Sequence, residues 1–342
     1  MDWRTEADVL IVGAGTTGLY QLYRARAEGF SAVLLEAGLG VGGIWYWNNS
    51  FEARFEAESS VRGHLFSAEL GGAWERPEEG AGQPVIKGYL DHLVDRQDLR
   101  PHIRLGATVG SAVYDDPTGT WSVLTGDAVE YRARFLVAAT GALPAPGRLC
   151  TGGRQQAGAG PRRGRDAGRG HRVARQELSA PHVPANRSSA FSDSGVCAGG
   201  LIVAGDDAFS GGTLKRLGVR GRDGLRLAGY WADGPRSYLG VMTAGFPNFF
   251  FPGGPHCVPD NPRHPGDQVD FITGALVRAR EHGRDVVEVG LAAEEEWTDL
   301  MTGAPLPWRP HPLPGSPLGG PAGETADDAY GAFIFSEAGR VA

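Results

Sequence analysis

Lysine, cysteine and methionine are scarce in this sequence. Among its 33 basic residues only Lys87 and Lys215 are lysines, and arginine supplies the rest. The three cysteines, Cys150, Cys197 and Cys257, are too few and too widely spaced for a disulfide framework or a zinc cluster. We therefore expect a protein without structural disulfides and without a metal site.

Long apolar runs and an excess of positive charge are absent as well. No segment has the ~20 apolar residues of a transmembrane helix, and Met1–Val9 lacks the apolar core of a signal peptide. The net charge of −7 argues against nucleic acid or an anionic membrane as a partner of the whole chain. We expect a cytoplasmic protein, long enough at 342 residues for two domains.

A strand, a glycine-rich turn and a helix follow one another near the start of the chain. Asp8–Val12 (DVLIV) is typical of a buried parallel strand, and GAGTTG follows directly, with glycines at 13, 15 and 18. Gly13 permits the tight turn, Gly15 lets the backbone approach a pyrophosphate, and Gly18 lets the helix pack closely on the strand. The helix N-terminus adds N–H donors and a positive dipole for the phosphates.

An acidic residue follows at the distance that this motif requires. The apolar run Ala32–Leu35 predicts a second strand, which ends in Glu36, eighteen residues after Gly18. A carboxylate there can accept both hydroxyls of an adenosine ribose and would repel a 2′-phosphate. The motif therefore predicts a site for FAD or NAD and disfavours NADP at this position.

The loop after Glu36 favours FAD over NAD. Gly38–Asn48 (GLGVGGIWYWN) contains a Gly-Gly pair followed by Trp45. This order is typical of the loop that leads from adenosine toward the flavin in flavoproteins with two dinucleotide sites. The alternative is a glycine-rich turn that carries core aromatics, and we favour that alternative for Trp47.

Periodicity predicts the remaining elements of an α/β domain. Pro84–Arg96 has apolar residues at helical spacing, and turn signals separate three predicted strands, Val109–Tyr114, Thr120–Leu124 and Tyr131–Ala138. The last strand leads into Ala139–Gly141. We expect a Rossmann-like FAD-binding domain with a β-meander.

These motifs, in this order, resemble the N-terminal half of a Baeyer–Villiger monooxygenase of the cyclohexanone-monooxygenase type, a flavin-dependent group B enzyme. The resemblance covers residues 8–147 and resumes over 201–300. The second stretch includes GFPNFFFPGGP at Gly245–Pro255, DQVDFITGALVRAREHG at Asp267–Gly283 and AEEEW at Ala293–Trp297.

The resemblance implies that the chain binds FAD tightly, that NADPH reduces the flavin, and that a C4a-peroxyflavin converts a small ketone into an ester or lactone. It implies that the Gly-Gly-Pro turn after Pro252 meets the flavin, with its backbone N–H groups facing the ring. We interpret the preceding Gly245–Phe251 as a core strand rather than a ligand wall. No arginine here matches the family's catalytic arginine. The residues placed against the cofactor are Gly13, Gly15, Gly18, Glu36, Gly43, Ile44, Trp45, Glu56, Val109, Thr140 and Gly141.

The sequence departs from that family in three places. Glu56 stands where the family has an aspartate, the histidine fingerprint expected after Pro146 is absent, and the second, NADP-binding domain is largely missing. Such a domain needs on the order of 100 residues, and about half that number separates Gly147 from Gly200.

An arginine- and glycine-rich tract, GAGPRRGRDAGRGHR at Gly158–Arg172, occupies the place of that domain. A second phosphate loop is disfavoured because no apolar strand precedes the tract and Pro161 occupies the turn. A nucleic-acid-binding arm is the alternative, but the tract lacks interleaved aromatics for base stacking. We favour a disordered or disrupted segment. The expected parts are 1–147 and 201–300 for the FAD and substrate region, 148–200 for this segment, and 301–342 for a Pro/Gly-rich tail.

Four functions stay open at this point. The chain is an FAD-dependent monooxygenase of the Baeyer–Villiger type, a catalytically incompetent FAD-binding remnant, or an FAD-only oxidoreductase without its own NADPH site. RNA binding through the Arg/Gly tract is the fourth, and the acidic chain around the tract disfavours it.

Overall fold

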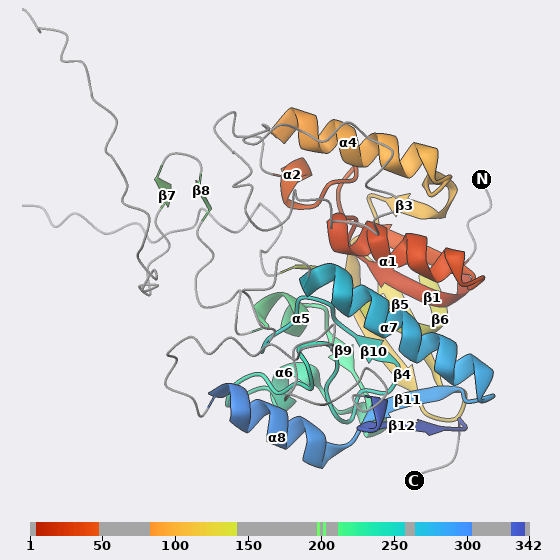
Figure 1. The fold of residues 1–342 in the computed structure, drawn as a ribbon, viewed down its shortest axis with the longest axis vertical. Coiled ribbons are helices and arrows are strands. Elements are labelled where there is room, and N and C mark those ends of the chain that lie inside the picture. The colour runs from red at the N-terminus through yellow and green to blue at the C-terminus, as the bar shows by residue number, and fades with distance from the viewer. Residues whose placement is uncertain are drawn as a thin grey trace, which may run out of the picture.

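The computed structural model describes residues 5–47, 83–141, 197–198, 201–202, 211–256, 264–302 and 330–338 (Figure 1). Three sequence-based expectations fall wholly or mostly outside these stretches. They are the cofactor contact of Glu56, the nature of the Arg/Gly tract at 158–172 and the Pro/Gly-rich tail at 301–342.

The first two long stretches contain the elements that the sequence predicts, with every predicted bound met to within two residues. They also contain a short helix at Ile44–Trp47, a 3-10 turn and the strand Ile103–Leu105, which the sequence does not predict. In chain order the elements are strand β1 (Glu6–Val12), helix α1 (Thr16–Ala27), strand β2 (Ala32–Glu36), helices α2 (Ile44–Trp47) and α4 (Gln83–Arg96), a 3-10 turn at Arg100–His102, and strands β3 (Ile103–Leu105), β4 (Val109–Asp115), β5 (Thr120–Thr125) and β6 (Glu130–Ala138).

The later stretches add shorter elements and two longer helices. None of the helices in the described part of the chain is long and apolar enough to cross a membrane. The elements are β7 (Cys197–Ala198), β8 (Leu201–Ile202), α5 (Gly212–Arg216), β9 (Val219–Arg220), a 3-10 turn at Arg222–Gly224, α6 (Leu227–Tyr230), β10 (Phe249–Phe250), α7 (His264–Glu281), β11 (Val286–Val289), α8 (Leu291–Thr302) and β12 (Phe333–Ser336).

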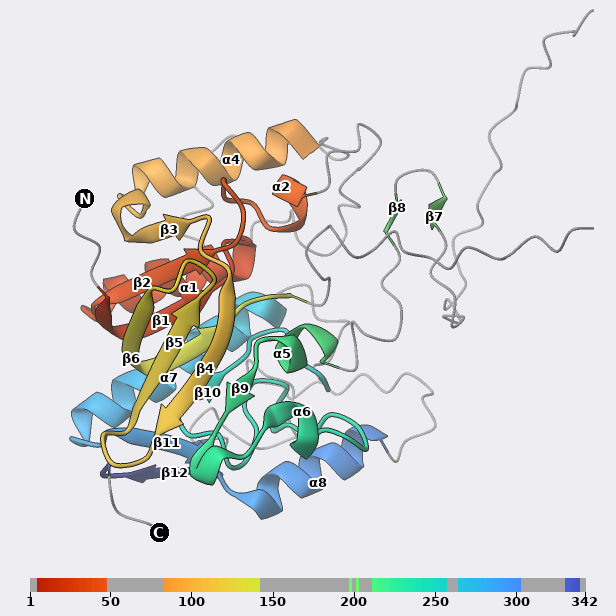
Figure 2. The ribbon, with the colours of Figure 1, turned by 180° about the vertical axis from the view of Figure 1, so that it is seen from behind.

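One mixed sheet organises most of these elements (Figure 2), while β11 pairs with β12 and β7 with β8 in two separate ribbons. The strand order of the mixed sheet is β3-β2-β1-β6-β5-β4-β9, and β10 also pairs with β6. The strands β3, β2, β1, β6 and β10 are parallel, whereas β5 is antiparallel to both β6 and β4 and forms the predicted meander with them.

Two strands share one edge of β6. Strand β5 pairs with β6 as far as Ala133, and β10 pairs with it at Leu136 and Val137. Strand β10 therefore extends the parallel part of the sheet, although it comes from a distant part of the sequence. Both of its residues, Phe249 and Phe250, are fully buried, which confirms the predicted core strand.

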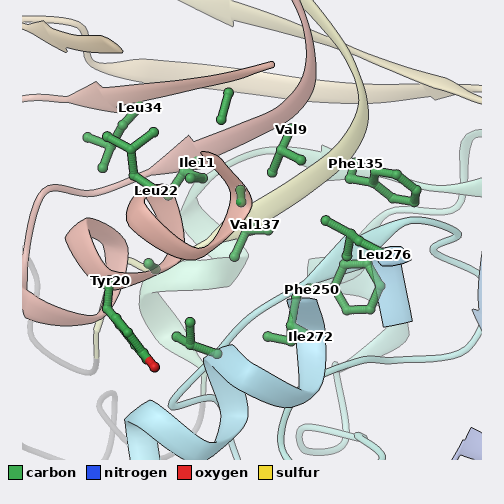
Figure 3. Close-up of a cluster of buried hydrophobic side chains, with 14 of the residues drawn as sticks. Val9, Ile11, Tyr20, Leu22, Leu34, Phe135, Val137, Phe250, Ile272 and Leu276 are labelled. Carbon is green, nitrogen blue, oxygen red and sulfur yellow. The ribbon is translucent and has the colours of Figure 1, made fainter. Parts of the chain in front are cut away.

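The strand sequences alternate between two cores. Val9 and Ile11 of β1 face one buried cluster, and Leu10 and Val12 face the other. Figure 3 shows the first cluster, where α1 and α7 cover the sheet. Both faces of the parallel strands are thus buried, as their nearly continuous apolar runs require.

Polar side chains join α1 to α7, which lie side by side in Figure 1. Tyr20 Oη donates to Asp270 Oδ1 at 2.9 Å, and the Arg24 guanidinium lies 3.0 Å from the same carboxylate. Gln21 Nε2 donates to Thr273 Oγ1 at 3.1 Å. Burial, and then the neighbouring Asp270 carboxylate, raises the pKa of Tyr20, so its hydroxyl keeps its proton. These contacts set the orientation of α7 on α1.

Candidate functional site

The glycine-rich turn joins β1 to α1 at the carboxyl edge of the sheet. Gly13 has a φ of +104°, and a Cβ there would lie 2.6 Å from the carbonyl oxygen of Ala139. A Cβ at Gly18 would collide with the carbonyl oxygen of Gly13. The backbone geometry therefore requires glycine at both positions, in the turn and in the helix packing.

Gly15 differs from these two glycines because the protein leaves its space open. Among the described residues, the nearest atom to a Cβ there is Gly43 Cα, at an ordinary 3.7 Å. Gly15 caps α1 without a side-chain hydrogen bond, and the first helical bond runs from Leu19 N to Gly15 O at 2.9 Å. The N–H groups before Leu19 have no partner within the helix, and together with the helix dipole they favour an anion.

Glu36 ends β2 beside this turn, and it is 5% exposed. One carboxylate oxygen accepts the N–H of Ala14 at 2.6 Å, and the other accepts the N–H of Gly38 at 2.7 Å. The two bonds orient the carboxylate and compensate its burial, while each oxygen keeps a further lone pair. The Glu36 carboxylate is therefore fixed in place at the end of β2, where the sequence predicts a contact with ribose.

The loop Gly38–Gly43 folds back over the glycine-rich turn. Gly42 N–H donates to Ala14 O at 2.8 Å. Gly43 has a φ of +55°, and a Cβ there would lie 2.7 Å from Gly15 Cα. The Gly-Gly pair is thus needed for close packing of this loop on the turn.

Helix α2 follows this loop and carries the predicted aromatic residues. Trp45 packs against the core cluster beneath α1 and α7, whereas Ile44 is 49% exposed. The expectation that Trp47 is a core aromatic is wrong. Its ring is half-buried and packs edge to face on Tyr46 at a centroid distance of 5.0 Å. Residues two apart lie on opposite sides of a helical turn, so Trp45 and Trp47 cannot both face the core.

The end of β6 lies against the same turn. The carbonyl oxygen of Ala139 and the Cα of Thr140 both lie within 3.6 Å of the Cβ position of Gly13. Gly141 follows with a φ of +64°, and no described atom lies within 4 Å of its Cβ position. The space that a side chain would occupy at Gly141 is therefore free of described atoms.

Val109, at the start of β4, lies on the Glu36 side of the site. Gly106 N–H donates to Gly38 O, and Ala107 N–H donates to Glu36 O, each at 2.8 Å. These bonds hold the segment that precedes Val109 against the end of β2. Among the predicted contact residues, Glu36 ends β2, Gly13 and Gly15 follow β1, and Thr140 and Gly141 follow β6, whereas Trp45 packs against the core cluster and Val109 begins β4.

The Gly-Gly-Pro turn after β10 corrects one expectation. Gly253 N–H donates to Gln268 Oε1 at 2.6 Å, and Gly254 N–H donates to Gly240 O at 3.2 Å. The proline that follows has no N–H. The expectation that these N–H groups face a ligand is wrong, because acceptors of the protein itself take them.

Sequence reasoning missed two residues beside this turn. Gln268 is fully buried in α7, and its one visible signal is a polar residue in the apolar face of a predicted helix, next to Val269. Leu239 has a φ of +55°, which is unusual for a branched residue and has no signature in the sequence.

A buried carboxylate lies where α8 meets the loop before β10. Glu294 is 0% exposed and accepts hydrogen bonds from Tyr230 Oη, Thr243 Oγ1, Ala244 N–H and Arg236 Nε. Burial first, and then the bond to Glu294, raises the pKa of Tyr230. Because four donors surround it, Glu294 joins α6, the loop and α8.

His256 follows the Gly-Gly-Pro turn. Its Nδ1 lies 3.5 Å from Ser237 Oγ, and its carbonyl oxygen accepts the Trp297 ring N–H at 3.4 Å. Burial lowers the pKa of His256. Across the described ranges, no group of three or more His, Cys, Asp or Glu side chains is arranged to hold a metal ion.

Comparisons with curated proteins find flavin monooxygenases, although no family model matches the chain. Acetone monooxygenase (methyl acetate-forming) from Gordonia sp. (strain TY-5) is 35% identical over 142 residues, which cover 42% of this chain and 27% of the relative. Cyclohexanone 1,2-monooxygenase from Acinetobacter sp. is 29% identical over 147 residues, which cover 43% and 27%. The matched segment spans about a quarter of the length of these relatives.

Solved structures share the fold over a longer span. Oxidized steroid monooxygenase bound to NADP matches with a TM-score of 0.70 and 23% identity, over 97% of this chain and 99% of that one. Cyclohexanone monooxygenase from Rhodococcus sp. Phi1 bound to NADP+ matches with a TM-score of 0.69 and 18% identity, over 98% and 100%. At these identities the likeness concerns the fold, which is the predicted Rossmann-type α/β arrangement.

Proposed function

The chain is a homologue of the Baeyer–Villiger monooxygenases over about two fifths of its length, and from this premise we propose that it is an FAD-dependent oxidoreductase of that type. The observation that carries the proposal is the arrangement at the carboxyl ends of β2, β1 and β6. There an oriented buried carboxylate, an open glycine at a helix N-terminus and an open strand end lie in a row.

The described residues fit the adenosine and diphosphate parts of FAD. Glu36 accepts the ribose hydroxyls, and its negative charge opposes a 2′-phosphate. The N–H groups at the start of α1 receive the diphosphate, because Gly15 leaves the space that the phosphates need. The row continues past Gly141 toward β10, which leaves the isoalloxazine at the ends of β6 and β10. Bound FAD would supply the redox chemistry by which such enzymes oxygenate a ketone.

We also propose a domain organisation for the chain. Residues 1–147 and 201–300 form one FAD and substrate region, residues 148–200 stand in place of the NADPH domain, and 301–342 form a tail. Support comes from β10, which pairs with β6, and from α7, which packs on α1. The described stretches contain one strand–turn–helix of the dinucleotide type, at Glu6–Ala27.

A second function follows from that single motif. An FAD-only oxidoreductase, reduced by its substrate or by a partner protein, would need no NADPH domain of its own. The catalytically incompetent remnant stays the third alternative. For the two enzymatic alternatives the proposed substrate is a small ketone. For all three, neither nucleic acid nor a membrane is a proposed partner, and the proposed location is the cytoplasm.

The test of the proposal is the visible spectrum of the purified full-length chain. Oxidised flavin that stays with the protein through desalting is the expected result. Glu36→Leu should release most of the flavin because the ribose hydroxyls and two backbone N–H groups lose their acceptor. The matched control is Glu28→Leu, at a half-buried surface glutamate just after α1. A chain without flavin absorbance, or equal retention by both variants, would contradict the proposal.

The identity of the electron donor that reduces the bound flavin distinguishes the three alternatives. Anaerobic mixing with NADPH bleaches the flavin of a self-sufficient monooxygenase, and a ketone with oxygen then accelerates NADPH consumption. An FAD-only enzyme is bleached by its substrate or protein donor and not by NADPH. A remnant retains flavin but shows no donor-dependent turnover above that of free flavin.

A further inference from the structure

The row of strand ends gives the proposed FAD site a direction. Strands β2, β1, β6 and β10 are neighbours in that order and parallel, so their carboxyl ends meet at one edge. Ligands of such sheets bind along that edge. With the ribose at Glu36 and the diphosphate at Gly15, the isoalloxazine reaches the turns that follow β10. This step rests on the proposed function.

Two left-handed backbone turns meet beside the end of β10. Leu239 and Gly240 have φ values of +55° and +67°, and Gly253 has a φ of +72°. Phe251 N–H donates to Val241 O at 2.9 Å, which ties the strand to the first turn. Backbone conformations of this kind in a branched residue persist only where the surroundings enforce them, and they concentrate at functional sites.

The side chain of Gln268 bridges the two turns. Its Oε1 accepts the Gly253 N–H at 2.6 Å, and its Nε2 donates to Leu239 O at 2.9 Å. The side chain is fully buried, so an apolar replacement would leave a donor of one turn and an acceptor of the other unpaired. One amide group thus fixes both turns relative to each other.

Helix α7 carries Gln268 and is itself oriented by α1. Asp270 and Thr273, in the turns that follow Gln268, bind Tyr20 and Gln21 of α1. Helix α1 begins at the anion-binding turn. The same helix pair therefore relates the diphosphate end of the site to the turns after β10.

We propose that Gln268 is a positioning residue for the isoalloxazine end of the FAD site. It holds the Leu239–Gly240 and Gly253–Gly254 turns in the shape that receives the flavin ring, and it acts through their backbone. Its loss therefore weakens contacts with the flavin half of FAD and leaves the adenosine diphosphate half bound as before.

Two ligands separate these halves in a binding experiment on the full chain. FAD is the whole cofactor, whereas ADP contains only its adenosine and diphosphate and lacks the isoalloxazine. Gln268→Met, which keeps the volume and removes both hydrogen bonds, should weaken FAD about tenfold and change ADP less than about twofold. The visible absorption bands of bound FAD should also shift. The control is Gln97→Met, at a half-buried glutamine just after α4 and outside the α1–α7 contact, which should leave the FAD-to-ADP affinity ratio unchanged.

A rescue variant keeps the test decisive if the methionine variant folds poorly. Gln268→Glu retains an acceptor for Gly253 N–H, and only its protonated form donates to Leu239 O. Its FAD affinity relative to ADP should therefore rise as the pH is lowered. Equal loss of FAD and ADP, or an unchanged ratio at every pH, would overturn the inference while leaving the proposed function standing. If the unsubstituted chain binds neither FAD nor ADP, both the Gln268 inference and the proposed function are wrong.

Discussion

The two ends of the proposed cofactor site are built in different ways. At the ribose and diphosphate end, β1, the glycine-rich turn, α1 and Glu36 come from one continuous stretch of the chain. At the flavin end, β6 comes from one stretch of the chain, the Leu239 and Gly253 turns from a second and α7 from a third. The first end depends on local backbone geometry, whereas the second depends on long-range hydrogen bonds. Substitutions should therefore affect the two ends differently.

The largest effect is expected for Gly18→Val at the first end. A side chain there collides with the backbone of Gly13, which is itself held by its N–H bond to Leu35 O and by its close packing on Ala139. We expect a loss of about 3 kcal/mol or more in the free energy of unfolding, with loss of both FAD and ADP binding. Chemical denaturation and ligand titration measure both.

The control for that substitution is Gly88→Ala in α4. No described atom lies within 4 Å of a Cβ at Gly88, which lies inside the helix. Alanine there should stabilise the protein by about 0.5–1 kcal/mol. If Gly18→Val were tolerated as well as Gly88→Ala, the close approach of α1 to β1 would be refuted.

At the second end, Asn248 is the residue whose replacement should lower the stability of the protein most. Its Oδ1 accepts the Val287 N–H at 2.7 Å, and its Nδ2 donates to Asp285 O at 2.8 Å. Its carbonyl oxygen accepts the Leu136 N–H at 2.9 Å. The residue thus ties β6 to β11 just before β10, and it does so with a φ of +58°.

Asn248→Ala should lower the free energy of unfolding by about 3 kcal/mol, because buried backbone groups lose their partners and alanine disfavours the left-handed conformation. Asn248→Gly keeps the conformation and removes only the hydrogen bonds, so its loss should be smaller. FAD binding should fall more than ADP binding in both. Equal losses for alanine and glycine would show that the backbone conformation contributes nothing.

A smaller effect is expected at Glu294, which is buried away from both ends. Glu294→Gln should cost about 2 kcal/mol, since the amide cannot accept all four hydrogen bonds and leaves Arg236 without its buried counter-charge. Glu295→Gln removes a partner of the same arginine, but its side chain is 54% exposed, and the change should stay within about 0.5 kcal/mol. Thermal unfolding of both variants makes the comparison.

The smallest effect concerns His256 and pH. Its pKa in the folded protein lies below the ordinary value of 6.5, so the unfolded chain binds a proton that the folded chain resists. Stability should therefore decline as the pH falls below 6.5 toward the lowered pKa, and it should be independent of this group above 6.5. His256→Asn removes the titration, and asparagine tolerates the φ of +62°. Urea midpoints across this range should show a flatter dependence in the variant, and an identical slope would contradict the assignment.

The sequence predicted the first end well because its signals are local. Gly18 is constrained by Gly13, five residues before it, and Gly13 by Ala139 at the end of the neighbouring strand, while Glu36 follows at a regular distance. The helix at 84–96 and the meander strands were likewise predicted because their apolar periodicity is complete within each segment.

The second end escaped prediction for physical reasons. Nothing within Gly253–Pro255 indicates that a glutamine from the next helix takes the Gly253 N–H, so the expectation of free donors was wrong. The left-handed conformation of Leu239 has no sequence signature, since leucine is not a residue that favours it. Trp47 was misplaced because an apolar side chain in a short helix does not indicate which side of the helix meets the core.

The sequence by itself determined the alternation of strands and helices, the glycine-rich turn and the acidic residue at the end of β2. These depend on period, conformational freedom and short-range spacing, all of which can be read along one segment. Tertiary structure alone decided that β10 joins the edge of β6, that α7 lies on α1, and that Gln268 connects two turns. Those outcomes depend on which buried donors and acceptors meet after the chain has closed, and their free energies arise only between segments far apart in the sequence.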